Sequence, residues 1–320
     1  MEVRAALKQG IAQLRDASVP SFTLAAELLL LHTLGRDRTW LYAHPEEPVS
    51  ETDERRFQEL LKRRAAGEPT QHLTGKQEFW GLEFEVTPDV LIPRPETEHL
   101  IEVALDRLAV REIRAGRKQA LTGDGLLIAD IGTGSGCIAI ALAKELPGAR
   151  IIAAEISFAA LAVAQRNAAR HGVSDHIHFV ESNLLEAVSD WTRYIVPLQL
   201  HRPQEAERES PIINRETTFF DLVVSNPPYI GRRESGSLMR EVSDHEPELA
   251  LYGGEEGYEF YADLIAQAAR HSKSGGLLVL EMGHNSLPAV QPLLDLPNWA
   301  SVSVAKDLAG IDRVIAAERV

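Results

Sequence analysis

The fold is decided by one stretch of the chain, Leu126-Leu127-Ile128-Ala129-Asp130-Ile131-Gly132-Thr133-Gly134-Ser135-Gly136-Cys137. Its apolar first half predicts a strand buried on both faces at 126–131, and the apolar segment 137–146 predicts a helix. The glycines between them let the backbone turn sharply and let a ligand approach the main chain. The stretch therefore predicts a strand, a ligand-binding turn and a helix in direct succession.

The same alternation of strands and helices continues to the end of the chain. Further strands are predicted at 150–156, 177–181, 219–225, 277–282, 301–307 and 313–317, and helices at 158–171, 258–271 and 286–294. Doubly buried strands that alternate with helices predict an α/β, Rossmann-like sheet of parallel strands. Only the link 308–312 joins the last two strands, so we expect a hairpin there and an antiparallel last strand in a seven-stranded sheet.

The segments before this sheet follow other patterns. Residues 1–75 show helical periodicity and predict a small helical domain. Alternating apolar residues at 76–93 predict a β-hairpin linker, with its turn at Thr87-Pro88-Asp89. The α/β domain is then expected at 94–320 and begins with a helix. Within it, the polar, proline-containing segment 191–218 predicts an inserted surface loop.

Charge and composition restrict the partners. The net charge is −14, which argues against a nucleic-acid substrate, because proteins that grip phosphate backbones usually carry a basic face. The single cysteine, Cys137, cannot form an intramolecular disulfide and fits a reducing compartment. No run of about eighteen apolar residues is present, so we expect no membrane span. These features predict a cytoplasmic protein without a direct nucleic-acid substrate. We also expect the protein to be a monomer.

The glycine turn favours S-adenosylmethionine as the ligand. A dinucleotide fingerprint would place glycine at Cys137, whereas the segment Gly132-Thr133-Gly134-Ser135-Gly136 after an acidic residue is typical of S-adenosylmethionine sites. Glu155 ends the next predicted strand, about twenty residues past the glycines, where a carboxylate can accept both ribose hydroxyls. An ordinary tight turn and a solvated strand-end carboxylate are the alternatives.

The third predicted strand ends at Ser182-Asn183-Leu184. In folds of this kind a polar residue at this place meets the adenine amino group, and an apolar neighbour covers the ring. Asn183 and Leu184 are the candidates for these two roles. Asn is also a good helix cap, and the sequence favours neither interpretation for Asn183.

The fourth predicted strand leads into Asn226-Pro227-Pro228-Tyr229, at the sheet edge where such folds bind ligands. The prolines remove backbone donors and stiffen the turn, which leaves carbonyl groups as acceptors. Asn226 adds a side-chain carbonyl, and Tyr229 adds a flat amphipathic wall. Such a site suits a planar NH₂ group, with Asn226 and the Pro227 carbonyl accepting its two hydrogens. A plain proline turn is the alternative.

The histidines and the cysteine fit a functional role less well than these motifs do. His176 and His178 alternate on a predicted strand without a partner cluster, so we expect no metal site. Cys137 opens a core helix and has no paired base in the sequence pattern, which favours a packing role over a nucleophilic one.

Together these motifs resemble the protein-glutamine methyltransferases that modify peptide chain release factors. The resemblance runs through nearly the whole chain and includes the segments Gln71-His72-Leu73-Thr74-Gly75, Phe79-Trp80-Gly81, Leu91-Ile92-Pro93-Arg94-Pro95-Glu96-Thr97-Glu98, Asn226 to Ile230, His245-Glu246-Pro247-Glu248 and Gly253-Gly254-Glu255-Glu256-Gly257. It implies a class I S-adenosylmethionine-dependent methyltransferase fold behind a helical substrate-recognition domain. It also implies methylation of the glutamine in the Gly-Gly-Gln motif of release factors.

The chain departs from that family pattern at three places. The family usually has aspartate where this chain has Glu155 and Asn183, and its link at 191–218 is usually shorter. Three rival functions stay open. One is the methylation of a ribosomal-protein glutamine, and another is the methylation of adenine or guanine amino groups in nucleic acid, which needs base flipping. A purely binding role is the third, but it leaves the two site motifs unexplained.

Overall fold

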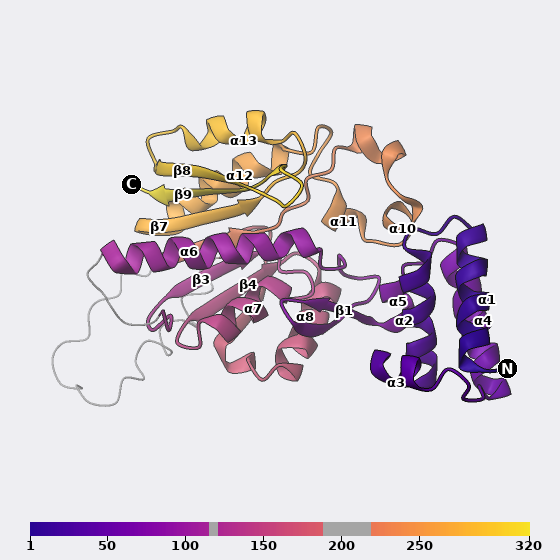
Figure 1. The fold of residues 1–320 in the computed structure, drawn as a ribbon. Coiled ribbons are helices and arrows are strands. Elements are labelled where there is room, and N and C mark those ends of the chain that lie inside the picture. Colours follow the sequence, from indigo (N-terminus) through magenta and orange to yellow (C-terminus); the bar gives the residue numbers. More distant parts are fainter. Residues whose placement is uncertain (115–120, 188–218) are drawn as a thin grey trace, which may run out of the picture. The chain divides into compact units, whose positions relative to one another are not determined.

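The computed structural model describes residues 1–114, 121–187 and 219–320 (Figure 1). The predicted insertion at 191–218 lies outside these described residues. Two compact units are present, and each is described by itself: Met1–Gln77, Val86–Pro88 and Ser237–Glu246 form the first, and Glu78–Glu85, Asp89–Gly236 and Pro247–Val320 form the second. The domain boundaries drawn from the sequence, at 75 and 93, stay a prediction.

The first unit is helical, with α1 (Val3–Asp16), α2 (Phe22–Leu34), α3 (Arg38–Ala43), α4 (Glu51–Ala65), α5 (Thr70–Thr74) and α10 (Arg240–Ser243). Its core is a cluster of apolar side chains from α1, α2 and α4. Gly10 lets α1 approach α4 closely, because a Cβ atom there would lie 2.8 Å from the ring of Phe57. None of the described helices has the length and apolarity needed to cross a membrane.

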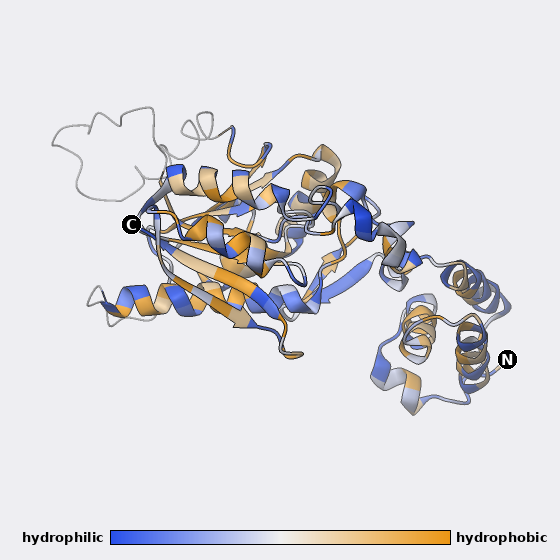
Figure 2. Ribbon diagram, turned by 90° about the horizontal axis from the view of Figure 1, so that it is seen from above, coloured by the Kyte–Doolittle hydropathy of each residue, from blue (hydrophilic) through white to orange (hydrophobic). Residues whose placement is uncertain are grey.

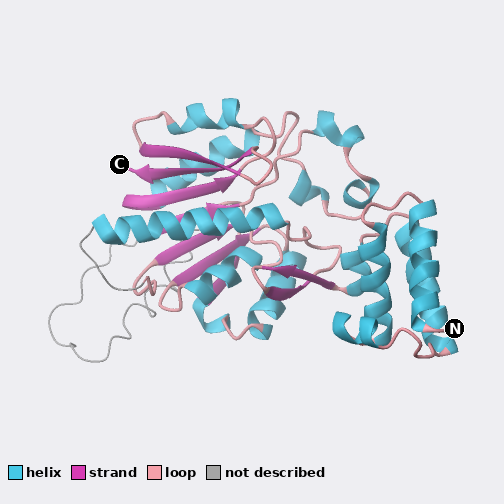
Figure 3. Ribbon diagram, viewed as in Figure 1, coloured by secondary structure: helices cyan, strands magenta, loops and turns pink. Residues whose placement is uncertain are grey.

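The second unit contains the predicted seven-stranded sheet (Figure 3). Its strands are β3 (Leu127–Ile131), β4 (Arg150–Glu155), β5 (Ile177–Glu181), β6 (Phe220–Ser225), β7 (Ser272–Glu281), β8 (Trp299–Lys306) and β9 (Asp312–Arg319). The spatial order is β5-β4-β3-β6-β7-β9-β8. β3 to β7 pair in parallel, and β9 pairs antiparallel with both β7 and β8. The fold class and the antiparallel last strand are confirmed.

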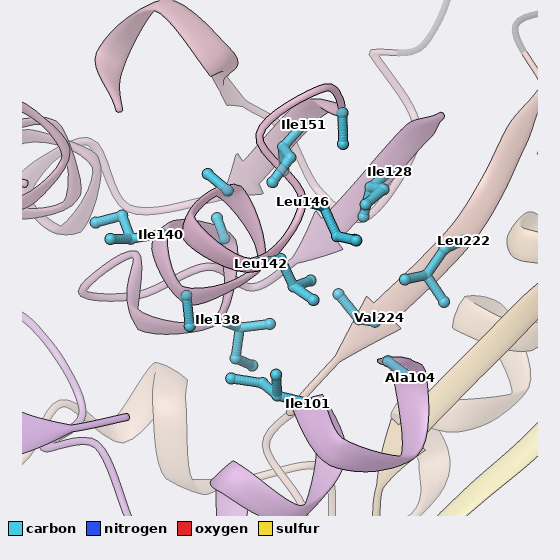
Figure 4. Packing of buried hydrophobic residues seen from close by; sticks show 14 of the residues in the cluster. Ile101, Ala104, Ile128, Ile138, Ile140, Leu142, Leu146, Ile151, Leu222 and Val224 are labelled. Carbon is cyan, nitrogen blue, oxygen red and sulfur yellow. The ribbon is translucent and has the colours of Figure 1, made fainter. Parts of the chain in front are cut away.

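Helices cover both faces of this sheet. α6 (Glu98–Arg114), α7 (Cys137–Glu145) and α8 (Phe158–Arg170) pack on one face, where Ile101, Leu142 and Ile128 belong to one buried cluster (Figure 4). α12 (Glu259–His271) and α13 (Leu287–Leu294) pack on the other. Figure 2 shows apolar residues concentrated on the strands between these helices. Burial on both faces explains the unbroken apolar runs of the inner strands.

Short elements connect these layers. They are η1 (Pro95–Thr97), η2 (Ser174–His176), η3 (Arg232–Ser237) and α11 (Glu248–Leu251). β7 begins five residues before the predicted position, because Ser272 pairs with Phe220 ahead of a register shift. The polar and glycine-rich start of that strand has no apolar pattern from which it could be predicted.

A hairpin lies within 76–93, but the predicted turn at Thr87-Pro88-Asp89 is wrong, and the residues after it form no strand. The two strands are β1 (Lys76–Phe79) and β2 (Leu82–Glu85), and the chain turns between them at Trp80 and Gly81. Both turn residues have positive φ, 54° and 67°. Trp80 is held in this uncommon conformation by bonds to distant groups: its backbone N–H donates to Glu98 Oε1 (2.7 Å) and its indole N–H to Glu145 Oε1 (2.8 Å).

Asn167 of α8 ties the hairpin to the glycine turn. Its Nδ2 donates to the carbonyl oxygens of Glu85 (3.0 Å) and Ser135 (2.9 Å), and its Oδ1 accepts from the Glu85 N–H (2.8 Å). The side chain is fully buried, so each bond replaces water that cannot reach these groups.

Replacing Asn167 by alanine leaves three backbone groups without these bonds. At about 1 kcal/mol for each, we expect Asn167→Ala to lower the free energy of unfolding by about 3 kcal/mol. The neighbouring Arg166 makes an exposed ion pair with Glu85, so Arg166→Ala should cost under about 1 kcal/mol. Urea unfolding of both variants checks this, and equal effects would refute the role given to Asn167.

Candidate active site

The predicted site motifs lie at one edge of the sheet because their strands run parallel. Ile131 at the end of β3 pairs with Ala154 of β4 and with Ser225 of β6. The glycine turn, Glu155 and Asn226 directly follow these three positions. Ser225 fixes the arrangement further, since its buried hydroxyl donates to the Ile131 carbonyl at 2.7 Å.

A cavity of about 240 Å³ opens at this edge. The predicted site residues that line it are Gly132, Gly134, Glu155, Asn183, Leu184, Asn226 and Pro228. Five other predicted residues do not line it: Thr133, Ser135, Gly136, Pro227 and Tyr229. The lining also includes wall residues from two other segments: Asp89, Val90 and Leu91, and Pro247, Leu249, Ala250, Tyr252 and Phe260. No role at the site was predicted for these wall residues, although several lie in the segments that carry the family resemblance.

The three glycines of the turn serve two purposes. Gly132 and Gly134 have positive φ, 72° and 54°, and an added Cβ atom would meet nothing closer than 4.0 Å. Their main chain therefore faces open space in which a ligand can approach. Gly136 instead permits packing, since a Cβ atom there would lie 3.1 Å from side-chain atoms of Ala164 and Ile140.

Asp130 lies beneath the turn and is fully buried. Its Oδ2 accepts from the Thr133 hydroxyl (2.6 Å) and from the Ala139 N–H (3.2 Å). Burial raises the pKa of Asp130 to about 7, although these two bonds lower it, and the negative charge of Glu155 adds to the rise. The carboxyl group therefore fixes the turn through its hydrogen bonds. Its ionised form lowers the stability of the fold, because the charge is buried.

The raised pKa of Asp130 predicts how stability varies with pH. A carboxyl whose pKa is higher in the folded state favours folding below the unfolded pKa, and this contribution is lost as the pH rises through about 7. We expect stability to fall between about pH 4 and pH 7, by up to about 1.4 kcal/mol per pH unit for this one proton. Asp130→Asn should flatten that fall in urea titrations at several pH values. An unchanged slope would contradict the assignment.

Glu155 forms one wall of the cavity and is fixed by backbone donors. Oε2 accepts from the Gly134 N–H (3.0 Å), and Oε1 accepts from the N–H groups of Ile156 (2.9 Å) and Ser157 (3.0 Å). A carboxylate has about four acceptor directions, so these bonds leave about one for a ligand hydroxyl. Glu155 thus both shapes the turn and offers a charged acceptor to the cavity.

Asn183 also faces the cavity, next to Leu184. Its Nδ2 donates to Glu186 Oε1 at 2.9 Å, and its backbone carbonyl accepts from the Glu186 N–H at 3.2 Å. Leu184 is buried and has positive φ, 51°. The turn therefore places an amide and an apolar side chain side by side on the cavity wall.

The two ends of the Asn226 side-chain amide differ in their hydrogen bonding. Its Nδ2 donates to the Thr97 hydroxyl at 3.0 Å. Its Oδ1 is buried and has no hydrogen-bond partner among the described residues. A buried acceptor without a partner is rare and costs about 1–3 kcal/mol, so this oxygen is suited to a donor that a ligand brings.

Tyr229 follows the same turn but does not line the cavity. Its hydroxyl donates to Glu281 Oε1 at 3.3 Å, and burial together with the charge of Glu281 raises the pKa of Tyr229 well above its usual value. Burial also raises the pKa of Glu281 to about 7. Neither Glu281 nor Thr97 was a predicted site residue. A lone carboxylate that ends an otherwise apolar strand is the signal from which Glu281 could have been found.

A glycine-rich loop holds the backbone of the Asn-Pro-Pro-Tyr turn. Ile230 donates to the Leu251 carbonyl (2.9 Å) and accepts from the Gly253 N–H (3.1 Å). A Cβ atom on Gly253 would lie 2.3 Å from the Pro228 carbonyl oxygen, so only glycine fits there. Gly257 is restricted in the same way, since a Cβ atom there would lie 2.5 Å from the Tyr229 carbonyl oxygen.

Comparisons with known proteins agree with this geometry. Residues 5–75 match the PrmC N-terminal domain, and residues 119–197 match the methyltransferase small domain. The release factor glutamine methyltransferase of Koribacter versatilis (strain Ellin345) is 39% identical and covers 98% of both chains. The enzyme of that name from Chlorobaculum tepidum is 38% identical over 96% of this chain and 94% of its own. The enzyme of that name from Burkholderia pseudomallei (strain K96243) is 39% identical over 94% of this chain and 93% of its own. The chain therefore belongs to the release factor glutamine methyltransferase family.

Proposed function

We propose that this enzyme transfers a methyl group from S-adenosylmethionine to the side-chain amide nitrogen of the glutamine in the Gly-Gly-Gln motif of a peptide chain release factor. One observation carries the proposal: the buried Asn226 Oδ1 lacks a partner at the end of β6, beside the cavity of the glycine turn. The names of the relatives support the substrate class. The reaction then belongs to the cytoplasm, where translation takes place.

The residues of the cavity fit S-adenosylmethionine. Gly132 and Gly134 leave the main chain open, and the start of α7 favours the negative carboxylate of an amino acid. Glu155 offers an acceptor to the ribose, and Asn183 with Leu184 offers an amide and an apolar surface to the adenine ring. Thr133, Ser135 and Gly136 support the turn from behind. When bound, the cofactor supplies an electrophilic methyl group on a positively charged sulfur.

The Asn-Pro-Pro-Tyr turn prepares the amide nitrogen for this methyl group. Amide nitrogen is a poor nucleophile because its lone pair is delocalised. Asn226 Oδ1 and the Pro227 carbonyl accept its two hydrogens, which holds the nitrogen in place and raises its electron density. Pro228 keeps the turn rigid, and Tyr229 supports it from the buried side. Positioning of this kind can lower the barrier by several kcal/mol.

The substrate assignment is tested by offering labelled cofactor to three purified substrates: a release factor, a ribosomal protein and duplex DNA. The proposal expects label on the release factor. Label on the ribosomal protein alone would mean that the enzyme methylates a ribosomal-protein glutamine by the same reaction. Label on DNA adenine would replace the proposal with the nucleic-acid function.

Removal of the carboxylate at Glu155 should weaken cofactor binding. The loss of a charged acceptor costs about 1.5–3 kcal/mol, so Glu155→Ala should raise the Kd by about 10- to 150-fold in calorimetric titrations. Glu181 is a matched control, because it is an exposed carboxylate at the end of the neighbouring β5 and lies outside the cavity lining. Glu181→Ala should leave the Kd unchanged. Equal values for the two variants would remove Glu155 from the cofactor site.

Asn226→Ala should lower kcat by about 10²–10³, since it removes one positioned acceptor from a dry site. Cofactor binding should stay within a few-fold of the wild type. Asn226→Asp should also be poor, because it loses the donor to Thr97 and adds a charge near the sulfonium. Steady-state assays with an intact release factor measure both variants. A kcat close to that of the wild type in Asn226→Ala would mean that another group accepts the amide hydrogen.

A further inference from the structure

Under the proposed function, the cavity has to admit two ligands, the cofactor and the polypeptide that carries the target glutamine. The residues proposed to hold the cofactor come from the glycine turn, Glu155 and the pair Asn183 and Leu184. A second group of lining residues comes from the segment 247–252, namely Pro247, Leu249, Ala250 and Tyr252. None of these four side chains is charged, so they offer contact area to a ligand rather than ion pairs.

Main-chain contacts tie this segment to the Asn-Pro-Pro-Tyr turn. Ile230, the residue after the turn, forms a parallel bridge with Tyr252, and its N–H donates to the Leu251 carbonyl at 2.9 Å. These contacts fix the backbone of the segment against the backbone that follows the turn. Tyr252 is therefore held beside the turn that carries Asn226, the residue proposed to receive the substrate amide.

The two leucines of α11 have different environments. Leu251 is buried, whereas Leu249 is 70% exposed although it lines the cavity. An exposed side chain that also lines a cavity belongs to the mouth of that cavity. The substrate polypeptide has to cross the mouth, because only its glutamine side chain reaches inward to Asn226. Apolar surface that the polypeptide covers there contributes to binding in proportion to its area.

Arg232 does not line the cavity, but it contacts a residue that does. Its guanidinium carbon lies 4.9 Å from the centroid of the Tyr252 ring, which is a cation–π distance. Its Nη1 pairs with Glu248 Oε2 at 3.5 Å, and its backbone N–H donates to the Gly254 carbonyl at 3.0 Å. Arg232 is thus tied to the chain on both sides of Tyr252, which restricts the ring to one place.

We propose that Leu249 and Tyr252 form the surface on which the substrate polypeptide docks beside its target glutamine, with Arg232 as a positioning residue for the Tyr252 ring. The inference rests on the proposed function and deepens it, because it names the part of the site that binds protein rather than cofactor. The occupant is a stretch of main chain. Glycines beside the glutamine have no side chains that would keep a flat aromatic ring away from their backbone.

A docking role predicts a change in KM without a change in the chemical step. Leu249→Ser removes the exposed apolar side chain, and Tyr252→Leu removes the flat ring but stays apolar. With a release factor as substrate, we expect each to raise KM about 5- to 20-fold, because apolar contact with the polypeptide is lost. The kcat at saturating release factor should stay within about twofold, since the contact is equal before and during methyl transfer.

The Kd for S-adenosylmethionine, measured by calorimetry, should be unchanged in both variants and shows that each is folded. A raised Kd for the cofactor in Leu249→Ser would assign this surface to the cofactor instead and would overturn the inference. A wild-type KM in both variants would overturn it as well.

Arg232 is tested against its neighbour Arg233. Both arginines are exposed and pair with a glutamate, but Arg233 pairs with Glu256 and lies over no aromatic ring of the described residues. Arg232→Ala should raise KM about 2- to 5-fold, the factor expected for an exposed cation–π contact. Arg233→Ala should leave KM unchanged. In Tyr252→Leu, the further change Arg232→Ala should have no effect, because the ring that Arg232 holds is gone.

Equal KM values for the two single arginine variants would overturn the positioning role, and so would losses that add in the double variant. A measurement without substrate tests the same contact. The ring current of Tyr252 should shift the side-chain proton signals of Arg232 in nuclear magnetic resonance spectra, and Tyr252→Leu should abolish that shift. Arg232 signals that Tyr252→Leu leaves in place would overturn the positioning role, whatever the enzyme methylates.

The wild-type assay separates the failure of this inference from the failure of the proposed function. If the wild-type enzyme leaves the release factor unmethylated, the proposed function fails, and the docking surface fails with it. If the wild-type enzyme methylates the release factor while Leu249→Ser and Tyr252→Leu keep its KM, only the docking surface fails. Methylation of the release factor together with raised KM values in both variants supports both proposals.

Discussion

The parallel pairing of β3 with β4 and β6 is the constraint on which the rest of the site depends. Parallel strands end at the same edge, so residues from positions 132, 155 and 226 meet although nearly a hundred residues separate the first from the last. Helices on both faces exclude water from the strands, and the inner strands are therefore apolar throughout. Polar groups can appear only where the strands end, and there the chemistry is concentrated.

The polar groups at this edge are buried at a cost in stability. Asp130 and Glu281 have raised pKa values, and Asn226 Oδ1 lacks a partner among the described residues. A fold selected for stability alone would replace them with apolar side chains of similar size. Their burial in a dry site strengthens each hydrogen bond that they make to a ligand. These polar groups therefore lower the stability of the fold, but they position the ligand as methyl transfer to an amide requires.

Much of the fold could be predicted from the sequence, because hydrophobic periodicity depends on local pattern and burial. The seven strands and the antiparallel last strand follow from that pattern. The hairpin turn could not be predicted, because Trp80 takes its left-handed conformation through bonds to Glu98 and Glu145, far along the chain. Likewise, the start of β7 at Ser272 has no apolar signature, since it depends on pairing with Phe220.

The candidate site was predictable only where glycine, proline and strand ends form a motif. Glu155 ends β4 and Asn226 directly follows β6, so both could be assigned by position. Thr97 and Glu281 could not, because their importance depends on hydrogen bonds to Asn226 and Tyr229 from distant parts of the chain, which the sequence does not display. Other lining residues of the cavity, including Leu249 and Phe260, are likewise brought there by tertiary packing.

The claim that Asn226 Oδ1 receives the substrate amide is tested most directly by a crystal structure. The complex should contain the demethylated cofactor and a release factor with its Gly-Gly-Gln loop. The account predicts that Asn226 Oδ1 lies at about 2.7–3.2 Å from the glutamine side-chain nitrogen, with Nδ2 still bonded to Thr97. A glutamine bound away from Asn226, or an Asn226 whose NH₂ group faces the ligand, would contradict it.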